Sequence, residues 1–210
     1  MKDISVKALA KINLGLDVVR KREDGYHEVR MVMQTIHLFD RLEISKNTSG
    51  EITMETNLSF LPTNENNLVY KAAKLLQDEF AIKDGVHVWL HKYIPVAAGM
   101  AGGSTDAAAV LYGMNQIFDL GLTREELMER GVKIGADVPY CIMRGTALAE
   151  GIGEKLSKLP PMVKCPVLIA KPQISVSTKF VYENLKLGSD MVHPDIDRLV
   201  ADIREKDLYK

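Results

Sequence analysis

A glycine-rich stretch carries the clearest chemical signal in the sequence. It runs from Pro95 to Asp106, reads PVAAGMAGGSTD, and joins an alternating apolar segment to an Ala-rich helical one. Glycine lets a backbone approach a ligand closely, and a following helix offers free N–H groups and the positive end of its dipole. The stretch therefore predicts a phosphate-binding loop, with Ser104 as helix N-cap and the Ser104 and Thr105 hydroxyls as donors. The alternative is a small-residue turn that packs a helix on a sheet.

The spacing of these glycines excludes several other nucleotide-binding loops. The sequence has no GxxxxGK[ST], so it has no Walker loop, and no GxGxxG of the dinucleotide or protein-kinase type.

A lysine and an aspartate form a second candidate group. Lys11 lies in AKINL, where strict apolar alternation over residues 4–18 places Lys11 and Asn13 on one strand face. Asp137 lies in GADVP. Alone, the lysine would be a solvated side chain and the aspartate a helix cap. Together they are the carboxylate and the cation that phosphoryl transfer to a hydroxyl requires.

Local periodicity predicts the elements that position these residues. Strands are expected over 4–18, 29–45, 85–92, 145–150 and 166–171, and helices over 66–80, 104–118, 177–185 and 195–203. Thr123 and Glu126 form a capping box that opens one more helix, and a further element begins at Ala136. Asp106 should complement the dipole in the first turn of its helix. Strands and helices mixed without a regular βαβ rhythm indicate an α+β fold.

The composition limits the class of protein. The chain has 210 residues, a formal net charge of -1, 46% hydrophobic residues and two cysteines. This balance gives no sign of a nucleic-acid or membrane partner, and the cysteines and histidines show no metal-ligand spacing. With neither a signal peptide nor a membrane-spanning run, we expect a cytoplasmic protein.

The loop and the two flanking motifs resemble the GHMP kinase family. GMAGGSTDAA is similar to the family's second motif, and AKINL and GADVP are similar to its first and a later motif. The resemblance implies that the loop holds ATP with Mg²⁺. It also implies that Asn67, in the segment NNL, lies near adenine. The loop residues so implied are Pro95, Ala98, Gly99, Met100, Ala101, Gly102, Gly103, Ser104 and Thr105. Ala101 replaces a family glycine, which a negative φ would tolerate.

The same resemblance assigns roles to the catalytic and acceptor-binding residues. It implies Asp137 as general base, Lys11 as its cationic partner, and Asn13 as a hydrogen-bonding group for the acceptor. Asp24 to His27 reads DGYH, which is similar to the family branch that acts on cytidine-diphosphate-linked methylerythritol. In that branch a tyrosine stacks on cytosine and a histidine binds the base edge, which implies Tyr26 and His27. Tyr182, rather than Phe180, would be the second aromatic.

The resemblance also implies an architecture. A ribosomal protein S5 domain 2-like N-terminal domain would span 1–159, and 160–210 would begin a ferredoxin-like C-terminal domain, with a boundary at Pro160-Pro161. The family's third glycine-rich motif, of SGSG type, is absent, so that second domain is expected to be truncated. A homodimer is a further expectation.

The activity implied is transfer of the ATP γ-phosphate to the 2-hydroxyl of the methylerythritol moiety, in the non-mevalonate isoprenoid pathway. The alternatives are an inactive truncated fragment or a non-catalytic nucleotide-binding protein of the same fold. A mevalonate or homoserine kinase is disfavoured by Tyr26, His27 and Tyr182, and an RNA-binding domain by the balanced charge.

Overall fold

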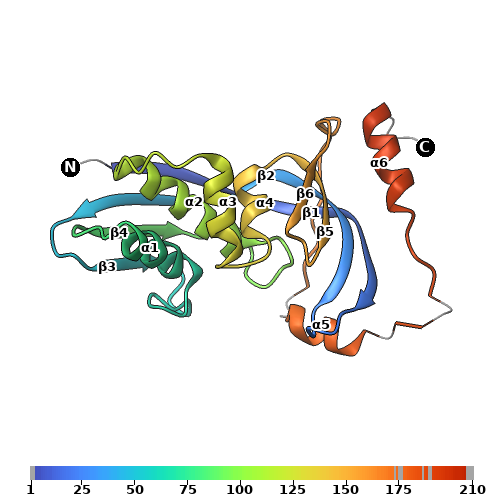
Figure 1. Ribbon diagram of the computed structural model, residues 1–210, viewed down its shortest axis with the longest axis horizontal. Coiled ribbons are helices and arrows are strands. Elements are labelled where there is room, and N and C mark those ends of the chain that lie inside the picture. Colours follow the sequence, from blue (N-terminus) through green and yellow to red (C-terminus); the bar gives the residue numbers. More distant parts are fainter. Residues whose placement is uncertain (1–2, 173, 175–176, 186, 189–190, 207–210) are drawn as a thin grey trace. The chain divides into compact units, whose positions relative to one another are not determined.

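Strands and helices alternate irregularly along the chain, and the α+β prediction is confirmed. The computed structural model describes residues 3–172, 174, 177–185, 187–188 and 191–206. The elements labelled in Figure 1 are β1 Asp3–Lys21, β2 His27–Asn47, β3 Ile52–Thr56, α1 Leu68–Glu79, β4 Gly85–His91, α2 Gly102–Ile117, α3 Arg124–Val132, α4 Val138–Met143, β5 Thr146–Gly151, β6 Lys155–Lys158, α5 Thr178–Asn184 and α6 Ile196–Glu205. None of the described helices is long and apolar enough to cross a bilayer.

The chain forms two compact units that interleave in sequence. Unit 1 takes the described residues of Met1–Ala10, Ile36–Val96 and Met100–Met143, and unit 2 takes those of Lys11–Thr35, Ala97–Gly99 and Arg144–Lys210. The long strands β1 and β2 therefore contribute residues to both units. The ranges 1–159 and 160–210, expected as domains, do not follow this division and stay a prediction.

In unit 1, β4 lies between β3 and β2. It runs parallel to β3, with residues 52–56 opposite 86–90, and antiparallel to β2, with residues 41–47 opposite 91–85. The predicted alternation in β4 is confirmed, because its buried aliphatic side chains are Val86, Val88 and Leu90. This face of the strands forms one side of the core of unit 1.

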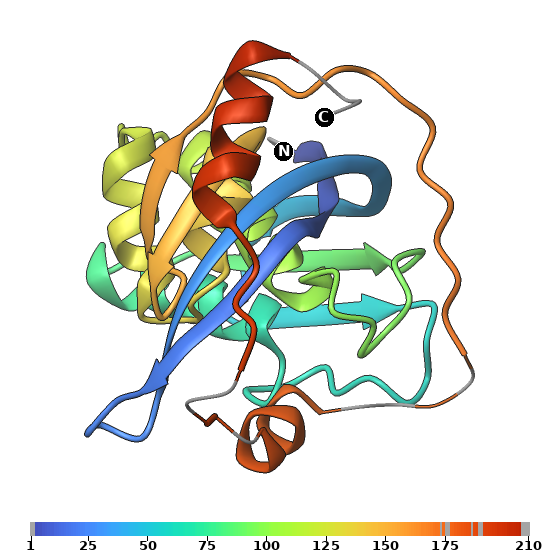
Figure 2. The ribbon, with the colours of Figure 1, turned by 90° about the vertical axis from the view of Figure 1, so that its right-hand side faces the viewer.

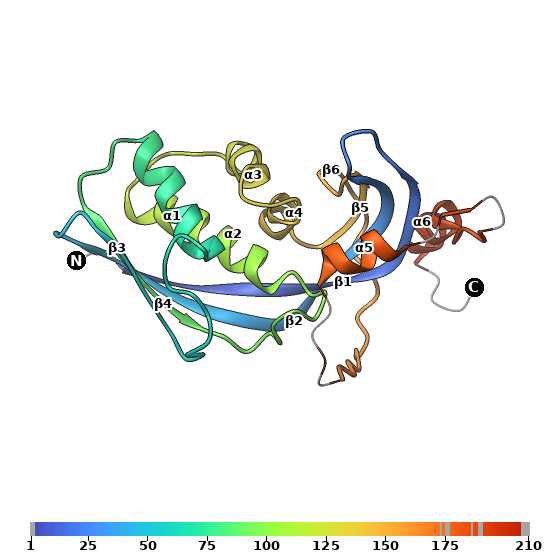
Figure 3. The ribbon, with the colours of Figure 1, turned by 90° about the horizontal axis from the view of Figure 1, so that it is seen from below.

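Helices α1 to α4 cover that face of the unit 1 strands (Figure 3). Helix α2 is central and packs against α1, α3 and α4. At Gly113, α2 comes so close to β2 that an added Cβ would collide with the side chain of Ile44. The capping box that opens α3 is confirmed: Thr123 Oγ1 accepts from the Glu126 N–H, and the Glu126 carboxylate accepts from the Thr123 N–H. The sequence thus places α2, which follows the glycine-rich loop, firmly on the sheet.

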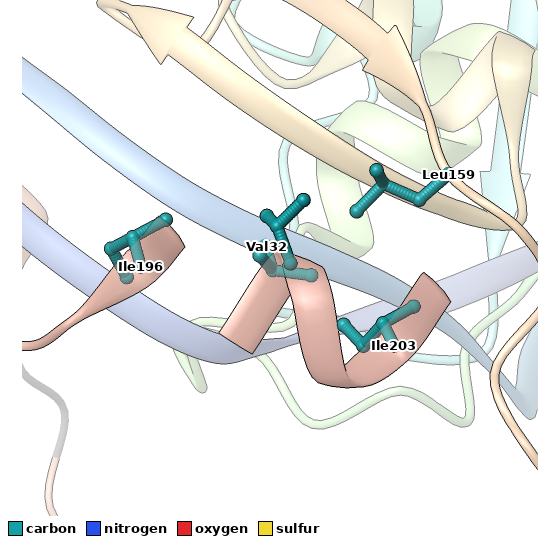
Figure 4. Packing of buried hydrophobic residues seen from close by; sticks show 5 residues of the cluster. Val32, Leu159, Ile196 and Ile203 are labelled. Atoms are coloured by element: carbon teal, nitrogen blue, oxygen red, sulfur yellow. The ribbon is translucent and has the colours of Figure 1, made fainter. Parts of the chain in front are cut away.

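In unit 2, β5 pairs with the first half of β2 and with β6. Residues 29–34 lie opposite 151–146, and residues 147–150 lie opposite 158–155, both antiparallel. Helix α6, red in Figure 2, packs on these strands through an apolar cluster shown close up in Figure 4. The buried members of this cluster are Val32, Leu159, Ile196, Val200 and Ile203. Arg30 of β2 adds two hydrogen bonds to the Asp197 carboxylate of α6, at 2.6 and 3.2 Å.

Two expectations about the strands are wrong. Residues 161–172 form neither helix nor strand, and Leu168 in this segment is 97% exposed. A strand needs a neighbour to pair its N–H and C=O groups, and no described strand pairs with the segment predicted over 166–171. In β1 the buried even-numbered face ends at Ala10: Lys11 and Asp17 are buried beyond it, whereas Leu16 is 40% exposed. The change comes where β1 passes from unit 1 into unit 2.

Candidate active site

The glycine-rich connection from β4 to α2 has a left-handed backbone at three positions. The φ angles are +54° at Ala97, +70° at Gly99 and +54° at Ala101. Ala101 therefore does not have the negative φ that would tolerate its methyl group, and its backbone adopts a left-handed conformation that costs an L-residue free energy. Met100 is buried, whereas Pro95 and Gly99 are exposed. The loop before Met100 is thus largely exposed, and the buried Met100 side chain anchors it.

The N-terminus of α2 has no side-chain cap. Its N-cap is Ala101, so the prediction of Ser104 as N-cap is wrong, and Asp106 lies beyond the first turn. The Thr105 N–H donates to the Ala101 carbonyl at 2.8 Å. Helix geometry leaves the N–H groups of residues 102–104 without intrahelical acceptors. These donors, together with the positive end of the helix dipole, make the start of α2 suitable for binding an anion.

Two side chains that were expected to bind ATP form hydrogen bonds with backbone groups of the protein instead. The Thr105 hydroxyl donates to the Leu9 carbonyl at 2.8 Å and is buried, so Thr105 ties α2 to β1 and is not retained as a hydroxyl donor to phosphate. Asn67 is the N-cap of α1: its side-chain oxygen accepts from the Val69 N–H at 2.9 Å, and its amide donates to the Pro62 carbonyl at 2.8 Å. The cap considered as the alternative for Asn67 is therefore confirmed.

Lys11 and Asn13 lie side by side on β1, as the alternation predicted. The Lys11 ammonium donates to the Asn13 side-chain oxygen at 3.1 Å, with Lys11 buried and Asn13 exposed. Asp137 is half-buried in the turn before α4, where its carbonyl accepts from the Cys141 N–H at 3.0 Å. Lys11 belongs to unit 2 and Asp137 to unit 1. Their catalytic pairing therefore stays a prediction.

The structure brings two of the predicted base-binding side chains together. The rings of His27 and Tyr182 lie with centroids 5.0 Å apart and planes tilted by 33°, although 155 positions separate them (182 − 27). Tyr26, which directly precedes His27 in the sequence, is 60% exposed. Its N–H donates to the Asp24 carboxylate, which also accepts from Arg22. These hydrogen bonds, that from Arg22 foremost, lower the pKa of Asp24 below its usual value.

A buried ionic cluster next to the loop was not predicted. The Lys92 ammonium donates to the Asp40 carboxylate and, at 2.8 Å, to Asp106 Oδ2. All three side chains are buried. The pKa of Asp106 is raised to about 8, chiefly by burial and also by the nearby Asp40, against the lowering effect of Lys92. We call these three residues the Asp40–Lys92–Asp106 cluster.

A signal for this cluster was present in the strand periodicity. Lys92 continues the buried even-numbered series of β4, and Asp40 has the same parity as the buried Leu42 and Ile44 of β2. Charged residues on a buried face are normally paired. Among the described residues, no group of three or more His, Cys, Asp and Glu side chains is placed to hold a metal ion.

The chain is similar to known kinases over nearly its whole length. Residues 67–145 match the family model described as the GHMP kinases N terminal domain. A 4-diphosphocytidyl-2-C-methyl-D-erythritol kinase of Lachnoclostridium phytofermentans is 60% identical over 207 residues, which are 99% of this chain and 71% of that protein. The kinase of that name from Lachnospira eligens is 58% identical over 99% of this chain and 72% of its own length.

A solved structure extends this similarity to the fold. A crystal structure of 4-(cytidine 5'-diphospho)-2C-methyl-D-erythritol kinase superposes with a TM-score of 0.76 at 31% identity, covering 97% of this chain and 72% of that one. Both the sequence and the fold are therefore shared across most of each protein. The chain belongs to the 4-diphosphocytidyl-2-C-methyl-D-erythritol kinase family, within the GHMP kinases.

Proposed function

We propose that this protein transfers the γ-phosphate of ATP to the 2-hydroxyl of 4-diphosphocytidyl-2-C-methyl-D-erythritol. The observation that carries the proposal is the 60% identity, over 99% of the chain, to a kinase named for that acceptor. Identity of this order over nearly the whole chain favours the kinase over a non-catalytic protein of the same fold. The product would be the 2-phosphorylated acceptor and ADP, a step of the non-mevalonate isoprenoid pathway.

ATP is proposed to bind with its phosphates against the start of α2. The left-handed positions of the loop expose backbone, and residues 102–104 supply N–H donors at the positive end of the helix dipole. The Ser104 hydroxyl adds a donor from the same turn. Mg²⁺ is proposed to accompany ATP and to neutralise charge on its phosphates, and no protein ligand for it is assigned.

Asp137 is proposed as the general base and Lys11 as the cation. The Asp137 carboxylate would accept the proton of the 2-hydroxyl while that oxygen attacks the γ-phosphorus and the bond to the ADP oxygen breaks. The positive charge of Lys11 would stabilise the negative charge that develops during the transfer. Asn13, held by Lys11 at 3.1 Å, would orient the acceptor from the exposed side of β1.

The cytosine of the acceptor is proposed to lie on the aromatic groups of unit 2. The exposed ring of Tyr26 offers a stacking surface, and the adjoining His27 and Tyr182 rings are already in contact. Base–aromatic stacking contributes about 1–3 kcal/mol per base. Asp24, bonded to the Tyr26 N–H, would hold the turn that presents Tyr26. Homoserine and mevalonate kinases have no nucleobase in their acceptors, so this aromatic group favours the cytidine compound.

The test is ADP release by the purified chain with ATP, Mg²⁺ and the acceptor. Asp137→Asn keeps the size of the side chain but cannot accept the proton, and we expect its turnover to fall at least about 10²-fold. Asp84→Asn, a change of the same kind in the turn before β4, is the matched control and should retain full turnover. Equal turnover of parent and Asp137→Asn would remove Asp137 as the base. If the chain shows no turnover with this acceptor but does with mevalonate or homoserine, then the proposed acceptor is wrong and that compound is the substrate.

The cellular setting stays a prediction. A reaction that consumes ATP and a nucleotide-linked polyol is proposed to take place in the cytoplasm, and a homodimer is proposed as the assembly. Sedimentation of the purified chain measures the latter directly.

A further inference from the structure

The Asp40–Lys92–Asp106 cluster contains one acidic side chain more than its single cation needs. Two buried carboxyl groups share one ammonium, and Asp106 Oδ1 has no hydrogen-bond partner among the described residues. A buried polar oxygen without a partner is destabilising and uncommon in folded proteins. Lys92 and Asp40 alone would form a balanced pair. The presence of Asp106 therefore needs an explanation other than charge balance.

The cluster ties together the chain on both sides of the glycine-rich loop. Before the loop, Asp40 Oδ1 accepts from the Tyr93 and Ile94 N–H groups at 2.6 and 2.8 Å. Asn57 holds the Lys92 backbone by two further hydrogen bonds, of 2.8 and 3.1 Å. After the loop, Asp106 attaches α2 to the Lys92 ammonium. The residues flanking the loop are therefore held by β2 and by one buried lysine.

The first residue of α2 also rests on this lysine. A Cβ added to Gly102 would lie 3.1 Å from Lys92 Nζ and 3.3 Å from the Ile94 side chain. Glycine thus lets the start of α2 settle directly against the cluster. The N–H donors of residues 102–104 are one turn or less from Asp106, so a shift of Asp106 changes the direction of those donors.

We propose that the Asp40–Lys92–Asp106 cluster positions the start of α2 for the ATP phosphates, with Asp106 as the residue that couples α2 to the buried lysine. This inference rests on the proposed function, because it takes ATP as the ligand at α2. Donors that are fixed before the ligand arrives bind it more tightly than donors that must be ordered on binding. Asp106 is a positioning residue, since it acts through the backbone of α2 and through Lys92.

The decisive comparison is between Asp106→Ala and Asp106→Asn. Asp106→Ala releases α2 from Lys92 but leaves Lys92 paired with Asp40, so this variant should fold. Asp106→Asn keeps an oxygen that accepts from Lys92. Asp78→Ala on α1, where the exposed Asp78 pairs only with Lys74 among the described residues, is the matched control. The measurements are calorimetric titrations with a non-hydrolysable ATP analogue plus Mg²⁺, and with CDP, each beside a thermal melt.

We expect Asp106→Ala to bind the ATP analogue about tenfold or more weakly, since small displacements of positioning groups have effects of this order or larger. Asp106→Asn should recover most of that affinity, and Asp78→Ala should match the parent. CDP affinity should stay the same in all variants, which separates positioning from general loss of structure. Parental ATP affinity in a folded Asp106→Ala, or equal losses for the two ligands, would overturn the proposal.

Two further outcomes separate this proposal from the proposed reaction. If the parent binds the analogue but releases no ADP with the acceptor, the reaction fails while the Asp106 variants still decide the positioning role. If the parent does not bind the analogue at all, the positioning role is overturned as well. Should Asp106→Ala not fold, Asp106→Asn with weak analogue binding but normal CDP binding would contradict the proposal by itself.

Discussion

At the scale of single residues, the protonation of the buried Asp106 carboxyl group determines the net charge of the Asp40–Lys92–Asp106 cluster. Asp106 accepts a hydrogen bond from the Lys92 ammonium, which also donates to Asp40. The raised pKa of Asp106, about 8, means that its carboxyl group keeps its proton at neutral pH. The cluster is then one ammonium, one carboxylate and one neutral carboxyl group, which a buried site accommodates far better than two carboxylates.

This protonation makes the stability of the protein depend on pH. Below the ordinary pKa of 3.8, Asp106 is protonated in both the folded and the unfolded chain. Between 3.8 and about 8 only the folded state keeps the proton, so the free energy of unfolding falls as pH rises. Above about 8 both states have lost it, and the dependence ends. We expect the parent to lose stability relative to Asp106→Asn from pH 5 to pH 8, with a limiting slope of about 1.4 kcal/mol per pH unit.

Urea unfolding of both proteins at one-unit intervals from pH 5 to pH 9 measures this difference. Other titrating groups are the same in the two proteins and cancel in the comparison. A constant difference between parent and variant would show that Asp106 is ionised in the folded protein throughout.

At the scale of elements, the start of α2 combines an uncapped N-terminus with a left-handed alanine. The αL conformation costs an L-residue about 1–2 kcal/mol, whereas glycine adopts it freely but loses roughly 0.5–1 kcal/mol more in backbone entropy on folding. Ala101, at φ +54°, therefore stores strain directly before the proposed phosphate donors. Strain of this kind is common at functional sites, where surrounding contacts maintain it.

Ala101→Gly should relieve this strain and raise the free energy of unfolding by about 0.5–1 kcal/mol. Ala201→Gly, in the exposed middle of α6, is the control of opposite sign and should lower it by about 1 kcal/mol. Chemical denaturation of the two variants beside the parent gives both values. A loss of stability in Ala101→Gly as large as that in Ala201→Gly would mean that the Ala101 methyl group is needed for packing.

Local sequence patterns predicted most helices and strands. They failed where contacts between residues distant in sequence determine the structure. The alternation in β4, the capping box of α3 and the helix expected over 177–185 are all confirmed, because each depends on neighbours in sequence. The segment 166–171 has the residues of a strand but no described strand beside it. The buried face of β1 changes after Ala10, which the period of two could not show.

The candidate site was predicted unevenly for the same reason. Lys11 and Asn13 are neighbours through strand geometry, whereas the contact between the His27 and Tyr182 rings depends on the fold. Ser104 is not the N-cap, because the helix begins two residues earlier than its hydroxyl side chain suggested. The parity of Asp40 and Lys92 on their strands indicated buried charges, but that these two residues and Asp106 form one cluster is known only from the fold.

At the scale of the whole molecule, the residues proposed for the acceptor all belong to unit 2. These are Asn13, Tyr26, His27 and Tyr182. The first turn of α2, proposed for the ATP phosphates, belongs to unit 1. Groups in different units without shared partners contribute to binding nearly independently. Each ligand should therefore respond to changes in its own group of residues and not to changes in the other.

Tyr182→Ala tests this independence from the acceptor side. Loss of an aromatic stacking surface costs about 1–3 kcal/mol, which corresponds to roughly a tenfold to hundredfold weaker binding of CDP. The affinity for the ATP analogue should stay at the parental value, the converse of the result expected for Asp106→Ala. Phe180→Ala, on the same helix and 61% exposed, is the matched control and should leave both ligands unaffected. A larger loss of CDP binding in Phe180→Ala would instead make Phe180 the second aromatic, because the two side chains lie two positions apart on α5 and only one can face His27.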